Sequence, residues 1–368
     1  MKRMLAPALV LLMLSLAACG KTTEAPAAPA APTPIQTAEI ASETAESKDE
    51  TAAAEAPAEG EPAAAPAEAA YSLDTRIVDV IGDPVFEDYG RLIFPQYFDE
   101  PEELGGRIRE NWTLKESYNV FFGYKHVNAE VIVDELNAMH DMAESGETIF
   151  YDIYTEAEKA EDPMKKETGL FFFRGDPGAK TAIVSPGGAF HYISAAQDGF
   201  PQALELSRRG YNAFVPIYRP GARSGCEDVA RAVAWLFEHE EELGIDMTDY
   251  SLWGGDVGGR LAAWVGRYGT EAFGQEATPK GCVVVQQYTA LYGAEITDLP
   301  TYANIGKQDT HAYPGNVTLR IASLDALGID TELEMFENLY HGYNIGRGTE
   351  AEGWIDNAIA FWEKHMTN

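Results

Sequence analysis

From Thr148 to the end of the chain, short apolar runs alternate with longer amphipathic segments. The runs at 148–155 and 169–175 are rich in β-branched and aromatic residues, and a charged connection that contains Pro163 separates them, so they predict two antiparallel strands. The later runs predict buried strands of a parallel sheet. These strands begin at Thr181, Tyr211, Tyr250, Cys282, Thr301 and Thr331.

The amphipathic segments between the later runs predict helices, because their apolar residues recur at helical spacing. These helices are expected at 200–209, 227–243, 260–269, 317–327 and 354–364. Strict alternation of strand and helix is the signature of a sheet covered on both faces. Residues 148–368 are therefore predicted to form one doubly wound, mostly parallel α/β domain with antiparallel first strands.

Residues 71–147 read as an N-terminal extension, aromatic-rich at its start and interrupted there by glycine and proline. One helix is predicted in it, capped by Asn128 and ending at Gly146, with Ile132 and Met139 on its apolar face. No chemistry is predicted for the extension, although it could form one wall of a substrate cleft.

The N-terminus has the features of a secretory signal. Lys2 and Arg3 precede an apolar segment at 5–16 that is too short for a stop-transfer helix. Small residues lead directly to Cys19, which resembles a bacterial lipoprotein signal at 1–18 with lipid on the Cys19 thiol. An ordinary secretory signal with an incidental cysteine is the alternative. The prediction is a membrane-anchored lipoprotein of the bacterial cell envelope that faces outside the cytoplasm.

Residues 19–70 continue as a tether made mostly of Ala, Pro, Glu, Thr and Ser, a composition that cannot offset the entropy of ordering. The whole chain carries a net charge of -32, which argues against nucleic acid as a partner. Two further cysteines, Cys226 and Cys282, could pair or remain isolated thiols. No cysteine spacing suits a metal, and neither a metal nor a cofactor is predicted.

The segment Trp253–Gly259, WGGDVGG, lies between a predicted strand and a predicted helix. A turn that exposes one side chain at this point needs small neighbours, and Gly254 and Gly258 supply them around Asp256. The amide groups at the start of the following helix favour negative charge. The segment therefore has the spacing of a nucleophile elbow, with aspartate where serine is expected.

Further candidate residues follow other strands. Pro186-Gly187-Gly188-Ala189-Phe190 comes directly after the strand at Thr181 and suits an oxyanion loop, in which backbone N–H groups of Gly188 or Ala189 and of Val257 would be the donors. Asp309 and His341 follow later strands, and parallel strands bring such ends to one edge of the sheet. His191 is a second-rank candidate for substrate contact.

The segments PGGAF, YNAFVPIYRPG, GGDVGGRLAAW, GKQD and YHGYNIG together resemble the α/β-hydrolase superfamily, and within it the acetyl-xylan-esterase-like and lipase-like carboxylesterases. The resemblance spans about Thr148 to the C-terminus. It implies that Asp256 holds the position of the nucleophile, His341 transfers protons and Asp309 orients His341. It also implies a small-molecule or glycan-borne ester as substrate.

Asp256 departs from that family and changes the expected chemistry. A carboxylate that attacks an ester carbonyl gives an uphill mixed anhydride, whereas attack on a saturated carbon gives a stable alkyl ester. Epoxide hydrolases and haloalkane dehalogenases of the superfamily work in the second way, but the segment 288–300 is too short for their cap domain. Three interpretations stay open: a hydrolase of esterase lineage with a replaced serine, a silent ligand-binding lipoprotein, and an Asp-nucleophile hydrolase.

Overall fold

A computed structural model describes residues 69–95, 112–121 and 123–367 of the protein. The predicted signal peptide, Cys19 and almost the whole of the predicted tether lie outside the described residues. The described residues belong to one compact unit, which contains both the extension and the strand–helix series.

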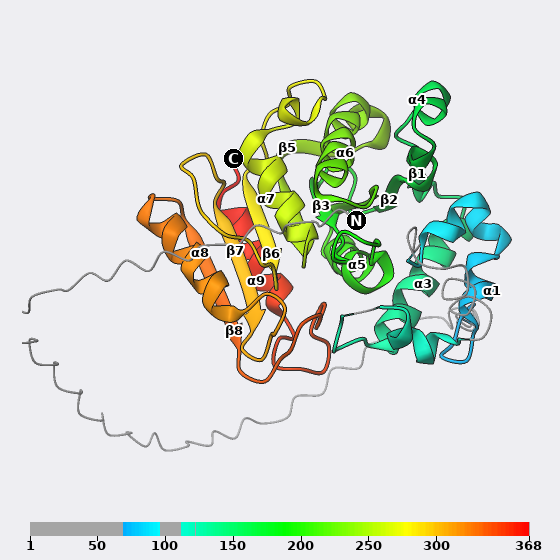
Figure 1. Cartoon of the computed structure of the whole chain (residues 1–368). Helices are drawn as coiled ribbons and strands as arrows, with labels where there is room; N and C mark the ends of the chain where they lie inside the picture. Colours follow the sequence, from blue (N-terminus) through cyan, green and yellow to red (C-terminus); the bar gives the residue numbers. More distant parts are fainter. Residues whose placement is uncertain (1–68, 96–111, 122, 368) are drawn as a thin grey trace, which may run out of the picture. The chain divides into compact units, whose positions relative to one another are not determined.

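One sheet organises the described residues, and its eight strands lie in the order β1-β2-β4-β3-β5-β6-β7-β8 (Figure 1). The strands are β1 (Phe150–Tyr151), β2 (Gly169–Phe173), β3 (Lys180–Ser185), β4 (Asn212–Ile217), β5 (Asp246–Gly255), β6 (Val283–Gln287), β7 (Thr301–Gly306) and β8 (Thr331–Phe336). Strand β2 pairs antiparallel with β1 and β4, and every other pairing is parallel. The predicted mostly parallel sheet with antiparallel first strands is confirmed.

The first strand is shorter than the sequence pattern suggests. The run 148–155 contributes two paired residues, Phe150 and Tyr151, because β1 lies at the edge of the sheet and pairs with β2 alone. After them the chain turns, and Thr155 caps the short helix α4 (Glu156–Glu161) by accepting from the Glu158 N–H. Apolar composition marked the run correctly, but it could not show where pairing stops.

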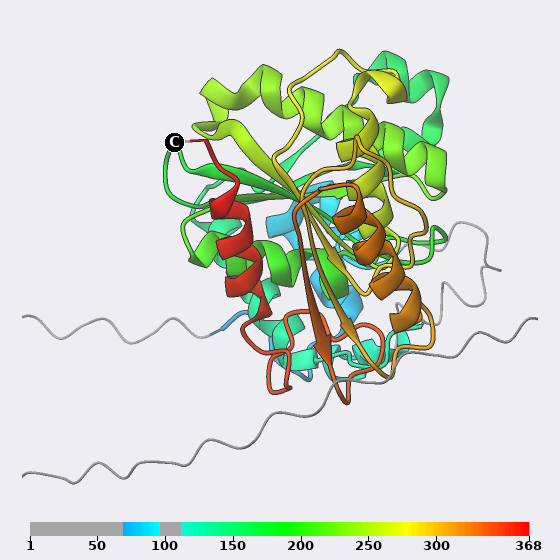
Figure 2. The ribbon, with the colours of Figure 1, turned by 90° about the vertical axis from the view of Figure 1, so that its left-hand side faces the viewer.

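Helices cover both faces of the sheet. They are α5 (Phe200–Arg208), α6 (Ala222–Leu243), α7 (Gly258–Tyr268), α8 (Pro314–Ala326) and α9 (Trp354–Lys364). Helix α5 contacts α9, and α6 contacts α7; α9 and α8 lie on opposite sides of the sheet (Figure 2). The predicted helices are present. Strands β3, β4, β6 and β7 are buried or nearly so along their lengths, and β5 is buried from Tyr250 on, as strands covered on both faces must be.

The extension packs onto this domain. It contains α1 (Ile77–Ile81), the 3₁₀ turns Pro84–Leu92 and Leu114–Asn119, and α3 (Ala129–Glu144). The side chain of Asn128 caps α3 by accepting from the N–H groups of Glu130 and Val131, as predicted. The apolar face of α3, which includes Ile132 and Met139, is buried in the same core as the sheet.

Two further findings concern the described residues. None of their helices combines the length and the apolar character that crossing a membrane requires. Cys226 and Cys282 are both free thiols, so the isolated-thiol alternative holds for this pair.

Candidate active site

Asp256 projects from the sharp turn between β5 and α7. Its φ is 48°, a left-handed conformation that a non-glycine residue adopts at a cost and that recurs at functional sites. The predicted need for small neighbours is met, because a Cβ on Gly254 would lie 2.3 Å from the carbonyl carbon of Gly258. A Cβ on Gly258 would lie 2.0 Å from the carbonyl oxygen of Ser185.

The Asp256 carboxylate is held by the predicted oxyanion loop. Its Oδ2 accepts hydrogen bonds from the backbone N–H groups of Gly188 at 3.1 Å and Ala189 at 3.0 Å. Its Oδ1 lies 3.8 Å from Nε2 of His341. One oxygen of the side chain thus fills the place where a substrate oxyanion would sit, and the other faces the histidine.

The oxyanion loop is itself strained. Gly188, Ala189 and Phe190 have φ values of 119°, 55° and 63°. A Cβ on Gly188 would lie 2.1 Å from the carbonyl oxygen of Tyr192, so the loop has no room for a side chain there. These torsions turn two consecutive N–H groups toward one oxygen, which is the geometry that stabilises developing negative charge.

Asp309 and His341 come together as predicted, from the ends of β7 and β8. Nδ1 of His341 lies 2.8 Å from Oδ2 of Asp309, and Oδ1 of Asp309 accepts from the N–H groups of His311 and Ala312. Burial opposes ionisation of Asp309, but these hydrogen bonds and the charge of His341 hold the pKa of its carboxyl below the usual value.

The same neighbours favour a protonated His341. Its side chain is 5% exposed, and burial alone would lower its pKa. The hydrogen bond to Asp309 and the negative charges of Asp256, Asp309 and Asp198 outweigh burial and raise the pKa above its ordinary value. Asp256, His341 and Asp309 therefore form a continuous acid–histidine–acid array.

A further carboxylate, which the sequence interpretation missed, lies beneath this array. Asp198 belongs to the short π-helical turn Ala195–Gly199 and is fully buried. It accepts hydrogen bonds from the Gly187 N–H at 2.8 Å, from the Tyr124 hydroxyl at 3.1 Å and from the Tyr288 hydroxyl. Tyr288 is itself fully buried, so its hydroxyl donates to this carboxylate from within the core.

The extension, for which no chemistry is predicted, makes direct contacts with the surroundings of the acid–histidine–acid array. Tyr124 belongs to the extension, and its hydroxyl reaches Asp198 across 74 positions of the sequence. The Lys125 N–H donates to the carbonyl oxygen of His341 at 3.0 Å, and Nε2 of His126 accepts from the Tyr340 N–H at 3.0 Å. The segment 124–126 thus clamps the loop that carries His341, a contact between distant segments that no local pattern marks.

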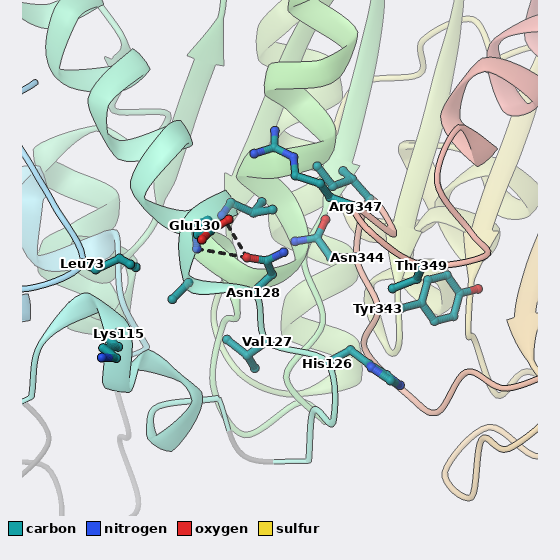
Figure 3. A pocket seen from close by; sticks show the side chains of 13 residues that line it. Leu73, Lys115, His126, Val127, Asn128, Glu130, Tyr343, Asn344, Arg347 and Thr349 are labelled. Carbon is teal, nitrogen blue, oxygen red and sulfur yellow. Dashed lines mark hydrogen bonds between the residues drawn. The ribbon is translucent and has the colours of Figure 1, made fainter.

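Beside that loop the extension and residues 343–349 together line an open pocket of about 470 Å³ (Figure 3). Its walls come from the start of α3 and from the loop after His341, with Lys115, Asn128 and Arg347 among the polar side chains. The three residues of the acid–histidine–acid array are not part of its lining. The cavity is therefore a neighbour of the site rather than its mouth.

The remaining candidates have less direct roles. His191 is exposed just after the oxyanion loop, and Val257 caps α7 directly after Asp256. Asp309, His311 and His341 offer ligand atoms within 4.8 Å of one another, so they could hold a metal ion. Doing so through Nδ1 would cost His341 its hydrogen bond to Asp309, and the existing geometry is that of a proton-transfer array.

No protein-family model matches the chain, and no curated protein matches it. Among solved structures the chain is similar to an acetyl ester-xyloside bifunctional hydrolase from Caldicellulosiruptor lactoaceticus, with 19% identity, a TM-score of 0.50, and coverage of 58% of this chain and 95% of the other. Esterase 2 from the Planctomycetes species Thermogutta terrifontis gives 20% identity and a TM-score of 0.48, with coverage of 54% and 87%.

At these identities the likeness concerns the fold. The sheet order, the helices on both faces and the elbow between β5 and α7 define the α/β-hydrolase fold, and the first of these neighbours shares it.

Proposed function

We propose that this protein is an α/β-hydrolase-fold hydrolase of esterase lineage in which Asp256 is the covalent nucleophile. The observation that carries the proposal is that the two oxygens of the Asp256 carboxylate make different contacts. Oδ2 accepts from the N–H groups of Gly188 and Ala189, while Oδ1 faces Nε2 of His341.

These contacts disfavour carboxylic esters, whether small or glycan-borne, as substrates of the protein with aspartate at position 256. The carbonyl oxygen of an ester would need the donors that Oδ2 already occupies. Attack by Oδ1 would also give a mixed anhydride, which lies uphill of the ester. We therefore assign ester hydrolysis to the lineage from which the protein derives, and we propose that Asp256 attacks a different kind of electrophile.

A saturated carbon that bears a leaving group, as in an alkyl halide or an epoxide, suits the same geometry. Oδ1 of Asp256 attacks that carbon, the carbon–leaving-group bond breaks, and its electron pair departs with the halide or the epoxide oxygen. For an epoxide, a proton from His341 neutralises the alkoxide. The product is an alkyl ester of Asp256 whose carbonyl oxygen, Oδ2, already lies between two donors.

Hydrolysis then regenerates the enzyme. Alkylation removes the charge of Asp256, so His341 loses one of the groups that favour its protonated form. After an epoxide opens, His341 has already given its proton to the alkoxide; after a halide leaves, it releases that proton to solvent. The neutral imidazole can then accept a proton from water. The hydroxide attacks Cγ of Asp256, and negative charge develops on Oδ2. Collapse releases the alkoxide, which takes the proton from His341 and leaves as the alcohol. The carboxyl group of Asp256, which now holds one water oxygen, passes its proton to His341 and restores the resting site.

Isotope labelling tests this cycle. The protein is mixed in heavy-oxygen water with less than one equivalent of short 1-bromoalkanes or terminal epoxides, and the peptide that contains Asp256 is analysed by mass spectrometry. One heavy oxygen is expected in Asp256. His341→Phe is the matched control, because it should stop after alkylation and accumulate the alkyl ester. Absence of both label and adduct across the panel would rule out the covalent cycle.

The esterase lineage has its own test. Asp256→Ser frees the oxyanion donors and supplies a hydroxyl beside His341, so hydrolysis of p-nitrophenyl acetate and of acetylated xylosides is expected. Asp256→Ala frees the same donors without a nucleophile and should remain inactive. A folded Ser variant that matches the Ala variant on every ester would count against the lineage.

The occupied oxyanion hole also favours a second candidate function, a catalytically silent ligand-binding lipoprotein. Under it, the contacts of Asp256 with Gly188 and Ala189 close the site against acyl groups. This candidate predicts that Asp256→Asn keeps ligand affinity, whereas the covalent cycle predicts loss of turnover in the same variant.

We further infer that the protein is anchored in the bacterial envelope through lipid on Cys19. The support is the sequence pattern of a basic start, a short apolar segment and small residues before the cysteine. Cys19→Ser should move the expressed protein from the membrane fraction to the soluble extracytoplasmic fraction. Unchanged membrane association would contradict the anchor.

A further inference from the structure

A buried carboxylate that is not part of the acid–histidine–acid array lies next to it. Asp198 is 0% exposed, and it accepts hydrogen bonds from three donors: the Gly187 N–H and the hydroxyls of Tyr124 and Tyr288. Donors on every partner stabilise the ionised form of a carboxyl. These hydrogen bonds thus favour the ionised form of Asp198 against the cost of its burial.

The two tyrosines connect this carboxylate to the catalytic histidine. The ring centroid of Tyr288 lies 4.8 Å from that of His341, and the ring of Tyr124 lies 5.6 Å from it. A Cβ on Gly342 would lie 2.2 Å from the Tyr124 ring, so the residue after His341 has no freedom to move toward the extension. The imidazole thus lies against two aromatic rings whose hydroxyls meet on one carboxylate, and the ring of His311 lies 4.9 Å from it as well.

Asp198 also lies against the elbow and the oxyanion loop. A Cβ on Gly187 would be 2.6 Å from Oδ2 of Asp198 and 2.7 Å from Cβ of Asp256. A Cβ on Gly255 would be 2.4 Å from Oδ1 of Asp198. The carboxylate therefore occupies the space directly behind the nucleophile position, where both glycines are required.

Asp198 and His341 affect each other's pKa values, and the charge of Asp256 affects both, as their close approach requires. Burial and the charge of Asp256 raise the pKa of Asp198 to about 6, against hydrogen bonds from Tyr288 and Gly187 and the charge of His341, which lower it. The charge of Asp198 in turn is one of the groups that raise the pKa of His341. Tyr218 also faces this region, but its hydroxyl donates to the Pro186 carbonyl at 2.6 Å.

We propose that Asp198 is a positioning residue that keeps His341 protonated in the resting site and holds the oxyanion loop through Gly187, and that the extension completes this network through Tyr124. The catalytic consequence rests on the proposed function, since the pH at which His341 becomes a base would be set partly by Asp198. The electrostatic statement itself holds whether or not Asp256 turns over.

Proton NMR titration of the histidine ring signals tests the proposal without any substrate. The His341 signal is assigned by its loss in His341→Gln, since the chain contains seven histidines. Asp198→Asn keeps the shape of the side chain and removes its charge, so the pKa of His341 should fall by about 0.5 to 1 unit. If the protein is active, the acid limb of its pH–rate profile should move to lower pH by the same amount.

Tyrosine variants supply the second measurement and the control. Tyr124→Phe and Tyr288→Phe remove donors to Asp198, so Asp198 should stay protonated to higher pH and the pKa of His341 should fall. Tyr154→Phe is the matched control, because its hydroxyl donates at 2.5 Å to another buried carboxylate, Asp228.

The result that would overturn the proposal is an unchanged His341 pKa in folded Asp198→Asn. If that variant does not fold, an unchanged pKa in the Tyr124→Phe, Tyr288→Phe double variant is equally decisive. An equal shift in Tyr154→Phe would also overturn it. A shifted pKa together with no turnover on any electrophile would sink the proposed function while leaving this inference intact.

Discussion

At the scale of single residues, the site depends on where side chains are absent as much as on where they are present. Asp256 can adopt its left-handed φ of 48° because the glycines on either side leave the turn room to bend. The one side chain that the turn exposes is therefore held rigidly against two backbone donors. Rigid placement of a charged oxygen is what a covalent step requires.

Gly258→Ala tests the steric part of this description. The added methyl would lie 2.0 Å from the Ser185 carbonyl oxygen and 2.6 Å from that of Pro186, both of which are backbone atoms. We expect a loss of about 3 kcal/mol in the free energy of unfolding, measured by urea denaturation. Gly315→Ala is the control, since no atom lies within 4 Å of its Cβ position in α8 and it should gain up to about 1 kcal/mol. Equal effects of the two substitutions would contradict the steric account.

At the scale of elements, the extension is part of the site's support. Helix α3 buries its apolar face in the common core, and the segment just before it clamps the loop of His341 through Tyr124, Lys125 and His126. A helix with one buried face gains most of its stability from that packing, and its cap decides where it begins. The start of α3 therefore determines where the clamp can lie.

Asn128→Ala tests this link. It removes the hydrogen bonds that the side chain accepts from the N–H groups of Glu130 at 3.0 Å and Val131 at 3.4 Å. A loss of about 1 kcal/mol is expected in urea denaturation, together with faster amide exchange in 124–126. Asn128→Asp keeps the acceptor and adds a charge that suits a helix N-terminus, so it should retain wild-type stability. If amide exchange in 124–126 is unchanged in Asn128→Ala, then the cap of α3 and the contacts of 124–126 with the His341 loop are independent of each other.

At the scale of the whole molecule, the buried charges of the site couple folding to pH. Asp309 has a lowered pKa, so its contribution to stability is present above the unfolded pKa and is lost as the pH falls. His341 has a raised pKa, so its contribution is present at low pH and is lost as the pH rises through the folded value. Asp198 behaves in the opposite way to Asp309, because its raised pKa makes the unfolded chain ionise first.

Asp198→Asn should remove the contribution of Asp198 to the pH dependence of stability. That contribution is measured as the difference between the stability–pH profiles of the wild type and the variant. Between the unfolded pKa of an aspartate, about 4, and the folded value of about 6, the native state binds more protons at Asp198, so wild-type stability falls as pH rises. Asp198→Asn lacks this decrease with pH. Its free energy of unfolding should therefore gain up to about 3 kcal/mol relative to that of the wild type between pH 4 and pH 7. Thermal or urea unfolding across this range measures it, and parallel profiles would contradict the raised pKa.

Much of the fold was predictable because it depends on local patterns. Period-two and period-3.6 hydrophobicity located the strands and helices of 148–368, and Asn128 marked the start of α3. Asp256, Asp309 and His341 were predictable because each follows a strand, and parallel strands end at one edge. Asp198 carried no such mark, since it lies in an irregular turn among small residues, and Tyr124 lies in a segment with no recognisable motif.

The sequence by itself determined the order of elements, the elbow and its array of partners, since these follow from spacing along the chain. Tertiary structure alone decided how the Asp256 carboxylate is oriented, because that depends on where the N–H groups of Gly188 and Ala189 point after the loop folds. It also decided that a tyrosine of the extension meets Asp198 and His341. Contacts between segments far apart in sequence arise from packing of the whole core, and no local pattern of residues encodes them.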